Sequence, residues 1–294
     1  MPKQTQPEIE SDGISLVGPV REDNQDSIRL PDESHPLDMG HLFAVADGMG
    51  GYAHGGMASN LAIQALYESY YDRADRPPQK GMQVGVERAN LSVYQTAQRL
   101  GVSRMGTTLT ALSIRGRQLF LAHVGDSRAY LLRKGKISCL TQDHTAVGDL
   151  VRMKVISPDR VRTHAQRSIL NRAIGLGLFV QPDLDALALE EGDRLVLCSD
   201  GLWSVIEDPD FADAMRAASS AEALSQRLAN IALDHGTDDN ISAVSVFVHA
   251  LADVPAPASN TANRWKWLNF LRNPRVPGNE MRLNPAPPLD GVVS

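Results

Sequence analysis

The sequence predicts an α+β fold in which antiparallel sheets are covered by helices on their outer faces. Short strand-like runs follow one another directly, with glycine-containing turns between them at residues 115–117 and 133–136. Such pairs of runs are typical of antiparallel hairpins. Two pairs of helical patterns separate the blocks of hairpins, whereas single helices between strands would indicate βαβ units and a parallel sheet.

The expected elements are short strands and paired helices, recognised by their apolar patterns. Strands are expected where brief apolar runs lie between turn residues, at 14–17, 42–46, 108–114, 119–124, 129–132, 194–198 and 241–248. Helices are expected where apolar residues recur at helical spacing, at 57–72, 82–100, 209–218 and 221–235. Residues 144–175 have more charge and less periodicity, so we expect a mobile insertion there.

The composition changes after Ala250, and residues 252–294 are rich in Pro, Ala and Asn. Such a segment is expected to lie outside the fold as a linker or disordered tail. Within it, residues 263–272 form a short amphipathic pattern that Asn263 can cap and Pro274 can end. We expect this segment to dock to a partner protein or to an anionic membrane surface, with packing back on the domain as the alternative.

The overall composition narrows the class of protein. The 294 residues allow one large domain or two small ones. A net charge of -6 argues against a nucleic-acid binder, which is normally basic. Cys139 and Cys198 lie in apolar runs and are expected to be reduced core residues. The polar N-terminus lacks a signal peptide, so we expect a soluble, cytoplasmic protein.

Five aspartates stand where a predicted strand begins or ends, and four of them lie beside Gly or Asn: Asp26, Asp47, Asp126, Asp200 and Asp239. One such aspartate is usually part of a turn, because its side chain mimics backbone turn bonding. Five together could converge on one edge of a sheet, where they would repel one another unless cations neutralised them. A set of carboxylates without Cys and with little His favours hard cations such as magnesium or manganese. The pattern therefore predicts a metal-assisted hydrolase.

The same region offers a second interpretation. Gly48-x-Gly50-x-x-Ala53 matches the dinucleotide-binding fingerprint and lies between a strand and a helix. However, Asp47 would direct negative charge at the pyrophosphate, and the next element is a second helix rather than a parallel strand. An acidic residue about 20 positions further on, at the end of such a strand, is also missing. We therefore do not favour nucleotide binding.

An ordered series of motifs resembles the bacterial branch of the protein phosphatase 2C family of metal-dependent serine/threonine phosphatases. The resemblance covers about residues 13–249. The motifs are Gly18-x-x-Arg21-x-x-Asn24-x-Asp26, Asp47-Gly48-Met49-Gly50-Gly51, Met105-Gly106-Thr107-Thr108, Val124-Gly125-Asp126-Ser127-Arg128, Asn171-Arg172-Ala173-Ile174-Gly175, Ser199-Asp200-Gly201-Leu202-Trp203 and Asp239-Asn240-Ile241-Ser242.

The resemblance implies a four-layer αββα sandwich, with two antiparallel sheets face to face and a helix pair outside each. It places the catalytic domain at residues 13–250, after a flexible N-terminus of residues 1–12 and before a tail of residues 251–294. The insertion at residues 144–175 then corresponds to the family's flap, which borders the active site. Its basic side chains suit the steering of phosphorylated chains: Arg152, Lys154, Arg160, Arg162, Arg167 and Arg172.

The resemblance also implies a metal site of two manganese or magnesium ions, with a possible third. Asp47 is similar to the carboxylate that bridges the two ions, and the Gly48 carbonyl to a ligand of the first. Asp200 and Asp239 resemble ligands of the second ion. Asp126, together with Asp200, resembles the third site of the bacterial enzymes.

Two residues are expected to act on the substrate. Arg21 is similar to the arginine that binds phosphate, for which a guanidinium fork is suited. Asp26 is similar to the acidic residue that holds the attacking, metal-bridging water. Three positions depart from common family patterns. Gln25 stands for a glutamate, Tyr52 for a histidine and Met49 for the histidine proposed as a general acid in eukaryotic members. The proton donor to the leaving group stays open.

The expected function is hydrolysis of phosphoserine and phosphothreonine in proteins. The expected partners are phosphorylated proteins, including a bacterial Ser/Thr kinase and its substrates, and no nucleic acid. One rival is a catalytically silent, phosphatase-shaped binding module, which would be free to lose at least one of the site residues. Another is a different two-metal hydrolase, such as a phosphodiesterase. Those sites normally include several histidines, and none belongs to this set.

Overall fold

The structure, a computed structural model, describes residues 7–32, 35–50 and 54–251. These residues form two sheets in which every strand pair is antiparallel. The first sheet has the order β1 (Glu8–Leu16), β11 (Ile241–Ala250), β10 (Arg194–Cys198), β7 (Arg128–Arg133) and β8 (Lys136–Cys139). The second has the order β2 (Asp26–Arg29), β3 (His41–Met49), β5 (Leu109–Arg115), β6 (Gln118–Val124) and β9 (Asp183–Ala188), and β4 (Gly106–Thr107) also pairs with β3.

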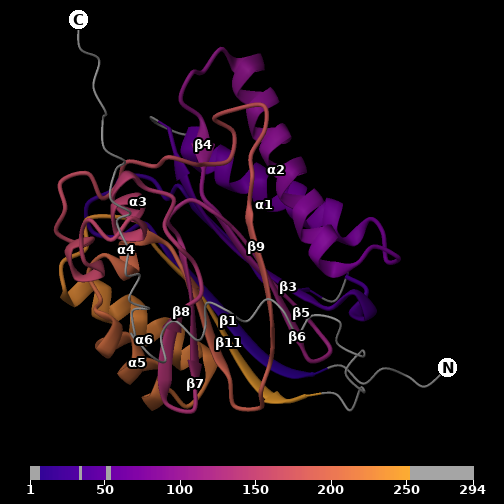
Figure 1. The fold of residues 1–294 in the computed structure, drawn as a ribbon, viewed down its shortest axis with the longest axis vertical. Helices are drawn as coiled ribbons and strands as arrows, with labels where there is room; N and C mark the ends of the chain where they lie inside the picture. The colour runs from indigo at the N-terminus through magenta and orange to yellow at the C-terminus, as the bar shows by residue number, and fades with distance from the viewer. Residues whose placement is uncertain (1–6, 33–34, 51–53, 252–294) are drawn as a thin grey trace, which may run out of the picture. The chain divides into compact units, whose positions relative to one another are not determined.

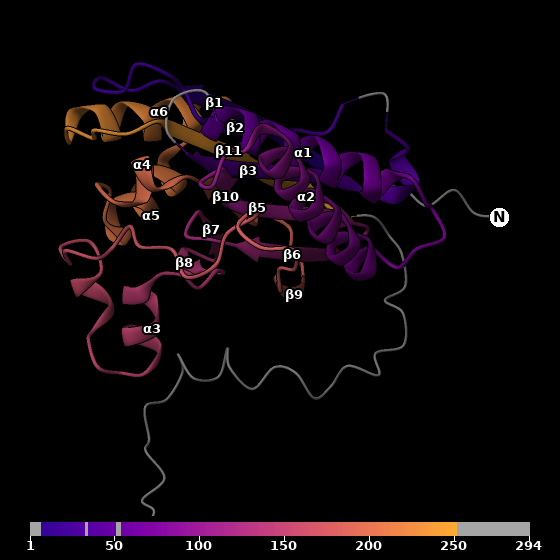
Figure 2. The same cartoon turned by 90° about the horizontal axis from the view of Figure 1, so that it is seen from above.

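Helices cover the outer faces of the stacked sheets (Figure 1). The helices α1 (His54–Tyr71) and α2 (Pro78–Leu100) pack on the second sheet. The first sheet is covered by α4 (Asp200–Trp203), α5 (Asp208–Ala217) and α6 (Ala221–Asp234). The flap contains α3 (Ala146–Arg152) and a short 3-10 helix, Pro158–Arg160, and α3 projects away from the strands (Figure 2). A second 3-10 helix, Leu37–Met39, precedes β3.

The alternation of side chains along β3 shows how the layers form. Phe43 and Val45 belong to the core between the two sheets. Leu42, Ala44 and Ala46 belong to the core between the second sheet and its helices. Successive strand residues point to opposite faces, so one strand supplies both cores. The αββα sandwich predicted from the sequence is therefore confirmed.

The long helix α2 shows why these residues form a helix. Its buried apolar residues recur three or four positions apart, at Met82, Val86, Ala89, Val93 and Ala97, which places them on one face. Proline occupies its first turn, where the missing N–H costs no helical bond. The helix ends at Gly101, whose φ of 67° is left-handed and suits glycine.

The N-terminal boundary is a correction to the sequence prediction. We expected flexible residues up to position 12, but β1 begins at Glu8 and pairs with β11 from Glu8 to Leu16. The strand has polar and small residues at Glu10, Ser11, Asp12 and Gly13, which hid it. As an edge strand of its sheet, β1 needs no continuous apolar run.

Other differences concern short elements. We did not predict β4, β8, β9, α3 or α4, each of which has at most seven residues. The dinucleotide-binding alternative is excluded by topology, because β3 is antiparallel to its neighbours and α1 leads directly to α2. Cys139 and Cys198 are free, as expected. Of the described helices, none has the length and apolar character required to span a membrane. The predicted docking segment 263–272 lies outside the described residues.

We expect removal of residues 253–294 to leave the domain folded. In the part of the chain that the structure describes, the sheets and helices already bury three apolar cores among themselves. The truncated protein should therefore melt within about 2 °C of the full chain, a change of at most about 1 kcal/mol. Thermal unfolding followed by circular dichroism measures this. A melting temperature lowered by several degrees would place the tail within the domain.

Candidate active site

The five predicted aspartates come together where the two sheets meet. Asp26 of β2 lies directly across from Asp47 of β3. Asp126 lies between β6 and β7, Asp200 begins α4 after β10, and Asp239 precedes β11. The negative charges of the other four all raise the pKa of Asp47. The site is therefore assembled from elements far apart in sequence, as the strand-end pattern predicted.

Asp47 is held by threonines of the neighbouring strand. The Asp47 N–H donates to the Thr108 hydroxyl at 2.8 Å, and the Thr107 hydroxyl donates to the Asp47 carbonyl at 2.8 Å. Thr108 N–H donates to the same carbonyl at 2.8 Å. These bonds satisfy the backbone at the end of β3 and leave the Asp47 carboxyl group for the site.

Gly48 must be glycine because other backbone segments approach it closely. A Cβ atom at this position would lie 2.1 Å from the Gly55 carbonyl oxygen and 2.5 Å from the Gln25 carbonyl oxygen. Both are backbone atoms, so a side chain could be admitted only by moving α1 or the segment before β2. The Gln25 side-chain oxygen lies against Gly55, next to the Gly48 carbonyl predicted to bind metal.

Asp26 is buried at the boundary between the sheets. Its Oδ2 accepts a 2.7 Å hydrogen bond from the Ser199 hydroxyl at the end of β10. Burial raises the pKa of Asp26 to about 7, with the charges of Asp200 and Asp239 adding to the effect, while hydrogen bonds from Ser199 and Ser242 oppose it. Asp26 can therefore exchange a proton near neutral pH.

Asp200 has one carboxylate oxygen without a partner in the described part of the protein. Burial and the charge of Asp239 raise the pKa of Asp200 to about 6, and a hydrogen bond with Asp47 favours its ionised form. Its other oxygen, Oδ1, is buried and has no hydrogen-bond partner among the described residues. A buried charged oxygen without a partner is costly, and a cation would satisfy it.

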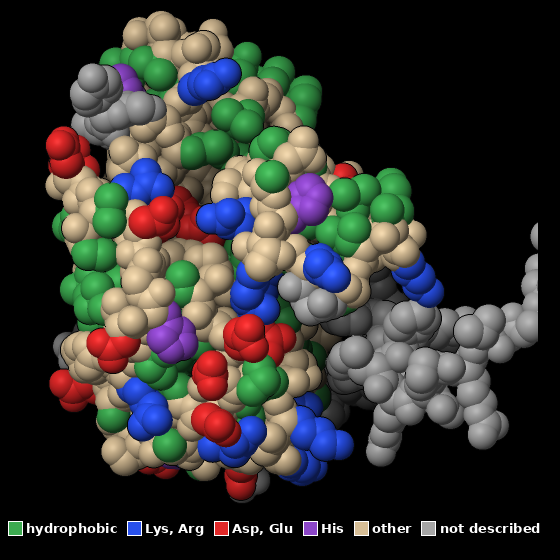
Figure 3. Space-filling view, turned by 90° about the vertical axis from the view of Figure 1, so that its left-hand side faces the viewer, with side chains coloured by type: hydrophobic (Ala, Val, Ile, Leu, Met, Phe, Trp, Pro, Cys, Tyr) green, Lys and Arg blue, Asp and Glu red, His purple; other side chains and the backbone are tan. Residues whose placement is uncertain are grey.

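Arg21 lies at the edge of this group. Its Nη2 donates to Asp239 at 2.7 Å, and its Nε donates to the Asp238 carbonyl at 3.3 Å. The side chain is 53% exposed, so its remaining donors can reach an incoming anion. On the face of the molecule shown in Figure 3, acidic side chains gather in a hollow and basic side chains lie beside it.

Asn240 fixes the segment that carries Asp239 to the segment that carries Arg21. Its side-chain oxygen accepts from Gln25 N–H at 2.9 Å. Its side-chain nitrogen donates to the Val17 carbonyl at 2.7 Å and to the Asp23 carbonyl at 3.0 Å. The two segments are more than 200 positions apart in sequence, so this one amide determines how Arg21 and Asp239 meet.

Asp126 is supported by a stack of side chains. The Trp203 indole N–H donates to the Asp126 carbonyl at 2.9 Å, and the Arg128 guanidinium lies 3.7 Å from the centre of the Trp203 ring. Arg128 in turn forms a two-bond ion pair with Asp143, at 2.9 and 2.7 Å. This stack connects the start of the flap to the carboxylate site.

The carboxylates fit hard cations by their chemistry. All candidate ligands are oxygen atoms, the type that manganese and magnesium bind, and the orphaned Asp200 Oδ1 and the mutual repulsion of the aspartates both call for positive charge. In the described part of the chain, no group of three or more His, Cys, Asp or Glu side chains is already arranged to hold a metal ion. Asp239 is bonded to Arg21 at 2.7 Å, so an ion that used Asp239 as a ligand would have to share this carboxylate with Arg21.

The flap is attached to the domain at its base. His144 N–H donates to the Gly125 carbonyl at 2.7 Å, and Asn171 N–H donates to the His144 carbonyl at 2.8 Å. Arg162, expected to steer substrates, instead donates to the Trp203 carbonyl at 2.9 Å and also pairs with Asp208. The steering role is therefore not supported for Arg162.

Two other flap arginines differ from each other. Arg172 pairs with Asp183 at 2.7 Å and is also committed to the fold. The positive charge of Arg167 lowers the pKa of Asp200, as a minor contribution, so Arg167 lies within electrostatic range of the carboxylate site. This agrees with the electrostatic role predicted for the flap.

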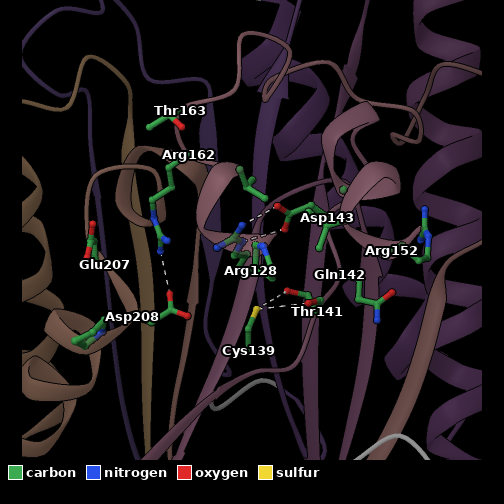
Figure 4. A pocket seen from close by; sticks show the side chains of 15 residues that line it. Arg128, Cys139, Thr141, Gln142, Asp143, Arg152, Arg162, Thr163, Glu207 and Asp208 are labelled. Carbon is green, nitrogen blue, oxygen red and sulfur yellow. Dashed lines mark hydrogen bonds and ion pairs between the residues drawn. The ribbon is translucent and has the colours of Figure 1, made fainter. Parts of the chain in front are cut away.

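A separate cavity of about 500 Å³ lies between the flap and α5. Its lining includes Arg128, Cys139, Asp143, Arg162 and Asp208, and none of the five site aspartates. Figure 4 shows two ion pairs among its lining residues, Arg128 with Asp143 and Arg162 with Asp208. The cavity is therefore lined by two members of the stack that supports Asp126, and it does not include the five aspartates.

Sequence reasoning missed the residues that position the aspartates. Asn240, Ser199, Thr108 and Trp203 each lie within a predicted motif, but their contacts join segments that only the fold brings together. The sequence indicated them only by their position near Asp239, near Asp200 or beside Thr107. Arg128 followed Asp126 by two positions and gave no indication of its ion pair with a residue of the flap base.

A family model for protein phosphatase 2C matches residues 21–235, which is more than half of the chain. This match agrees with the two-sheet fold and with the cluster of carboxylates where the sheets meet. The chain belongs to the protein phosphatase 2C family.

Two bacterial relatives illustrate the similarity. The serine/threonine protein phosphatase PstP of Mycobacterium tuberculosis is 37% identical over 228 residues, which cover 77% of this chain and 42% of PstP. The chain thus spans less than half the length of that relative. Protein phosphatase PhpP of Streptococcus pneumoniae is 31% identical over 238 residues, covering 79% of this chain and 95% of PhpP.

Solved structures have the same fold. The catalytic domain of PstP in complex with two manganese ions is 33% identical, with a TM-score of 0.71, and the match covers 82% of this chain and 98% of that structure. The S. agalactiae serine/threonine phosphatase is 32% identical, with a TM-score of 0.76 and coverage of 82% and 100%. The predicted fold class and family resemblance are confirmed.

We expect the metal-free protein to lose stability as the pH rises. The pKa of Asp26 is raised from 3.8 to about 7, so ionising this buried group costs folding free energy. The cost is absent below about pH 4, grows between the two pKa values and is complete above about pH 7. In excess chelator, the melting temperature of the unmodified protein should fall between pH 5 and pH 8. For Asp26→Asn this fall should be smaller by at least about 3 °C, which corresponds to roughly 1 kcal/mol.

Thermal unfolding at a series of pH values measures this effect. Asp72→Asn, at an exposed position after α1, is the matched control. Its melting temperature should change with pH as that of the unmodified protein does. An Asp26→Asn protein with an unchanged pH profile would show that Asp26 is not the group that titrates.

We expect the stack beneath Asp126 to be energetically coupled. Arg128→Met leaves Asp143 buried without its partner, which should lower the free energy of unfolding by about 3–5 kcal/mol. Arg128→Met with Asp143→Leu should recover part of this loss, because neither charge is then left alone. Urea unfolding of the two single variants and the double variant measures the coupling. Additive losses would mean that the ion pair does not support the stack.

Proposed function

We propose that this protein is a metal-dependent phosphatase that hydrolyses phosphoserine and phosphothreonine in proteins. The observation that carries the proposal is the convergence of five mutually repelling carboxylates at one edge of the sandwich, with the buried Asp200 Oδ1 lacking a partner in the described structure. Family membership and the names of the relatives support the same reaction class.

The proposed cofactors are two manganese or magnesium ions, with a possible third. Asp47 and the Gly48 carbonyl would hold the first ion. Asp47, Asp200 and Asp239 would hold the second, and Asp126 and Asp200 the third. When bound, such ions activate water for attack and stabilise negative charge on the phosphoryl group. The complex of the PstP catalytic domain with two manganese ions supports manganese as the proposed cofactor.

The chain's own residues would position the substrate and move the proton. Arg21 would turn part of its guanidinium fork from Asp239 to a phosphate oxygen, forming charge-assisted bonds. Asp26, with a pKa raised to about 7, would hold the attacking water and accept its proton. Arg167 would add positive charge beside Asp200 and attract the phosphorylated segment.

The silent binding module is less consistent with this site. A module that only binds has no need to bury five carboxylates together, because each one raises the cost of ionising the others. A phosphodiesterase-like two-metal site would recruit histidines, but His123 and His144 bond to Thr110 and to Gly125 N–H, respectively. The cytoplasmic location, the kinase partner and docking by the tail stay predictions.

We expect the purified protein to hydrolyse a small aryl phosphate only with added manganese or magnesium. Asp47→Asn and Asp239→Asn should each abolish turnover, because losing one anionic ligand weakens ion binding. Release of the aryl alcohol, measured by absorbance, follows turnover, and calorimetric titration with manganese measures binding separately. Asp12→Asn, on β1, is the matched control and should retain activity. Turnover that persists in excess chelator or in either site variant would contradict the metal assignment.

A further inference from the structure

A loop beside the site presents three large apolar side chains to solvent. Leu176 and Leu178 are each 50% exposed, and Phe179 is 88% exposed. We call residues 176–179 the apolar loop. Clustered apolar groups of this kind mark interaction surfaces on proteins that otherwise bury them.

The apolar loop is held in place by a buried asparagine of α2. Asn90 accepts from Gly175 N–H at 2.8 Å and donates to the Gly177 carbonyl at 2.9 Å and the Leu178 carbonyl at 3.2 Å. Asn90 is 1% exposed. One buried side chain therefore satisfies three backbone groups of this segment and fixes its course.

The far side of the loop is closed by a second anchor. Arg172 donates to the Gln181 carbonyl at 3.0 Å and to Asp183 at 2.7 Å. At the near side, a Cβ atom on Gly175 would lie 2.3 Å from a Val93 methyl carbon, so the backbone lies directly on α2. The backbone of the apolar loop is therefore held on both sides of the exposed side chains.

The loop is continuous with the carboxylate site. Ile174 exchanges backbone hydrogen bonds with Thr107, at 3.1 and 2.8 Å, and Thr107 donates its hydroxyl to the Asp47 carbonyl at 2.8 Å. Hydrogen bonds therefore connect Asp47 to Thr107 and Thr107 to Ile174, which lies two positions before the apolar loop.

Side chains of the apolar loop and of β3 also lie close together, at Gly106. A Cβ atom on Gly106 would lie 3.1 Å from a Leu176 methyl carbon and 3.2 Å from the Met49 terminal carbon. Met49 follows Asp47 by two positions on β3 and so lies on the same face of the strand, about 7 Å further along. The side chains of Leu176 and Met49 thus meet at Gly106, and Met49 lies two positions along β3 from Asp47.

We infer that the apolar loop is a docking surface for the polypeptide of a phosphoprotein substrate. The apolar loop would bind an apolar side chain of the substrate. The length of an extended chain places that side chain about two to five residues from the phosphorylated residue. The inference rests on the proposed function, because a phosphorylated chain that enters the site must cross the adjoining surface. The continuity with Asp47 and the positive charge of Arg167 beside Asp200 favour this occupant.

The test uses the full-length protein with manganese and synthetic phosphothreonine peptides. One peptide has serines on both sides, one has leucines at the second to fifth positions before phosphothreonine, and one has them after it. The unmodified protein should hydrolyse one leucine peptide with a kcat/KM about fivefold to twentyfold above that of the serine peptide, from partial burial of one or two side chains.

The double variant Leu178→Ser with Phe179→Ser should lose this preference. It should hydrolyse the serine peptide and a small aryl phosphate at the unmodified rate. Leu233→Ser, which changes an exposed leucine of α6 on the other side of the sandwich, is the matched control and should retain the preference. Circular dichroism of each variant establishes that it is folded.

The alternatives give different results. Equal rates on all peptides, or equal slowing of every substrate by the double variant, would overturn the docking inference while leaving the phosphatase assignment intact. Absence of turnover on every substrate, the aryl phosphate included, would instead remove the proposed function. A dimer that the double variant dissociates would make a second copy the occupant, and a preference seen only after removal of residues 253–294 would make the tail the occupant. Both results would overturn the inference.

Discussion

Mutual repulsion between buried carboxylates is the constraint on which this structure depends. Asp47 lies among four other aspartates whose charges all raise its pKa, and like charges in a poorly solvated place cannot all ionise without compensation. The fold accepts this cost because rigid elements hold the groups. Asp26 and Asp47 occupy facing positions on paired strands, and Asp200 starts a helix directly after β10. The repulsion among these carboxylates is therefore unfavourable in the absence of compensating positive charge.

The polar groups around the aspartates explain how the sandwich tolerates them. Ser199 donates to Asp26, accepts from Ser242 N–H and so joins the two sheets at their boundary. Asn240 joins the segments on either side of the same boundary. These bonds satisfy backbone and side-chain groups that the apolar core would leave without partners. They use neutral donors, so they position the carboxylates without neutralising them, which leaves that task to a ligand or to Arg21.

The sequence predicted those parts of the fold that depend on local pattern. The apolar run before Asp47 and the helical spacing along α2 identified β3 and α2, since each pattern reports which face is buried. The short strand β9 has charged and apolar residues in a mixed order, and β1 begins with polar residues, so neither has a strong local signal. The aspartates were predictable because turn chemistry marks strand ends. Their supporting contacts, such as Trp203 to Asp126, were not, because they depend on tertiary proximity.

The two sides of the site differ in how firmly their residues are held. On one side, Asn90 and Arg172 fix the apolar loop through backbone carbonyls, so its surface is preorganised and binding there costs little ordering entropy. On the other side, Arg21 is half-exposed and bonded to Asp239. Under the proposed function, a cation bound by Asp239 would free donors of Arg21, and the freed donors would raise the affinity of the site for an anionic substrate. Ion binding and phosphate binding would then be coupled through one guanidinium group.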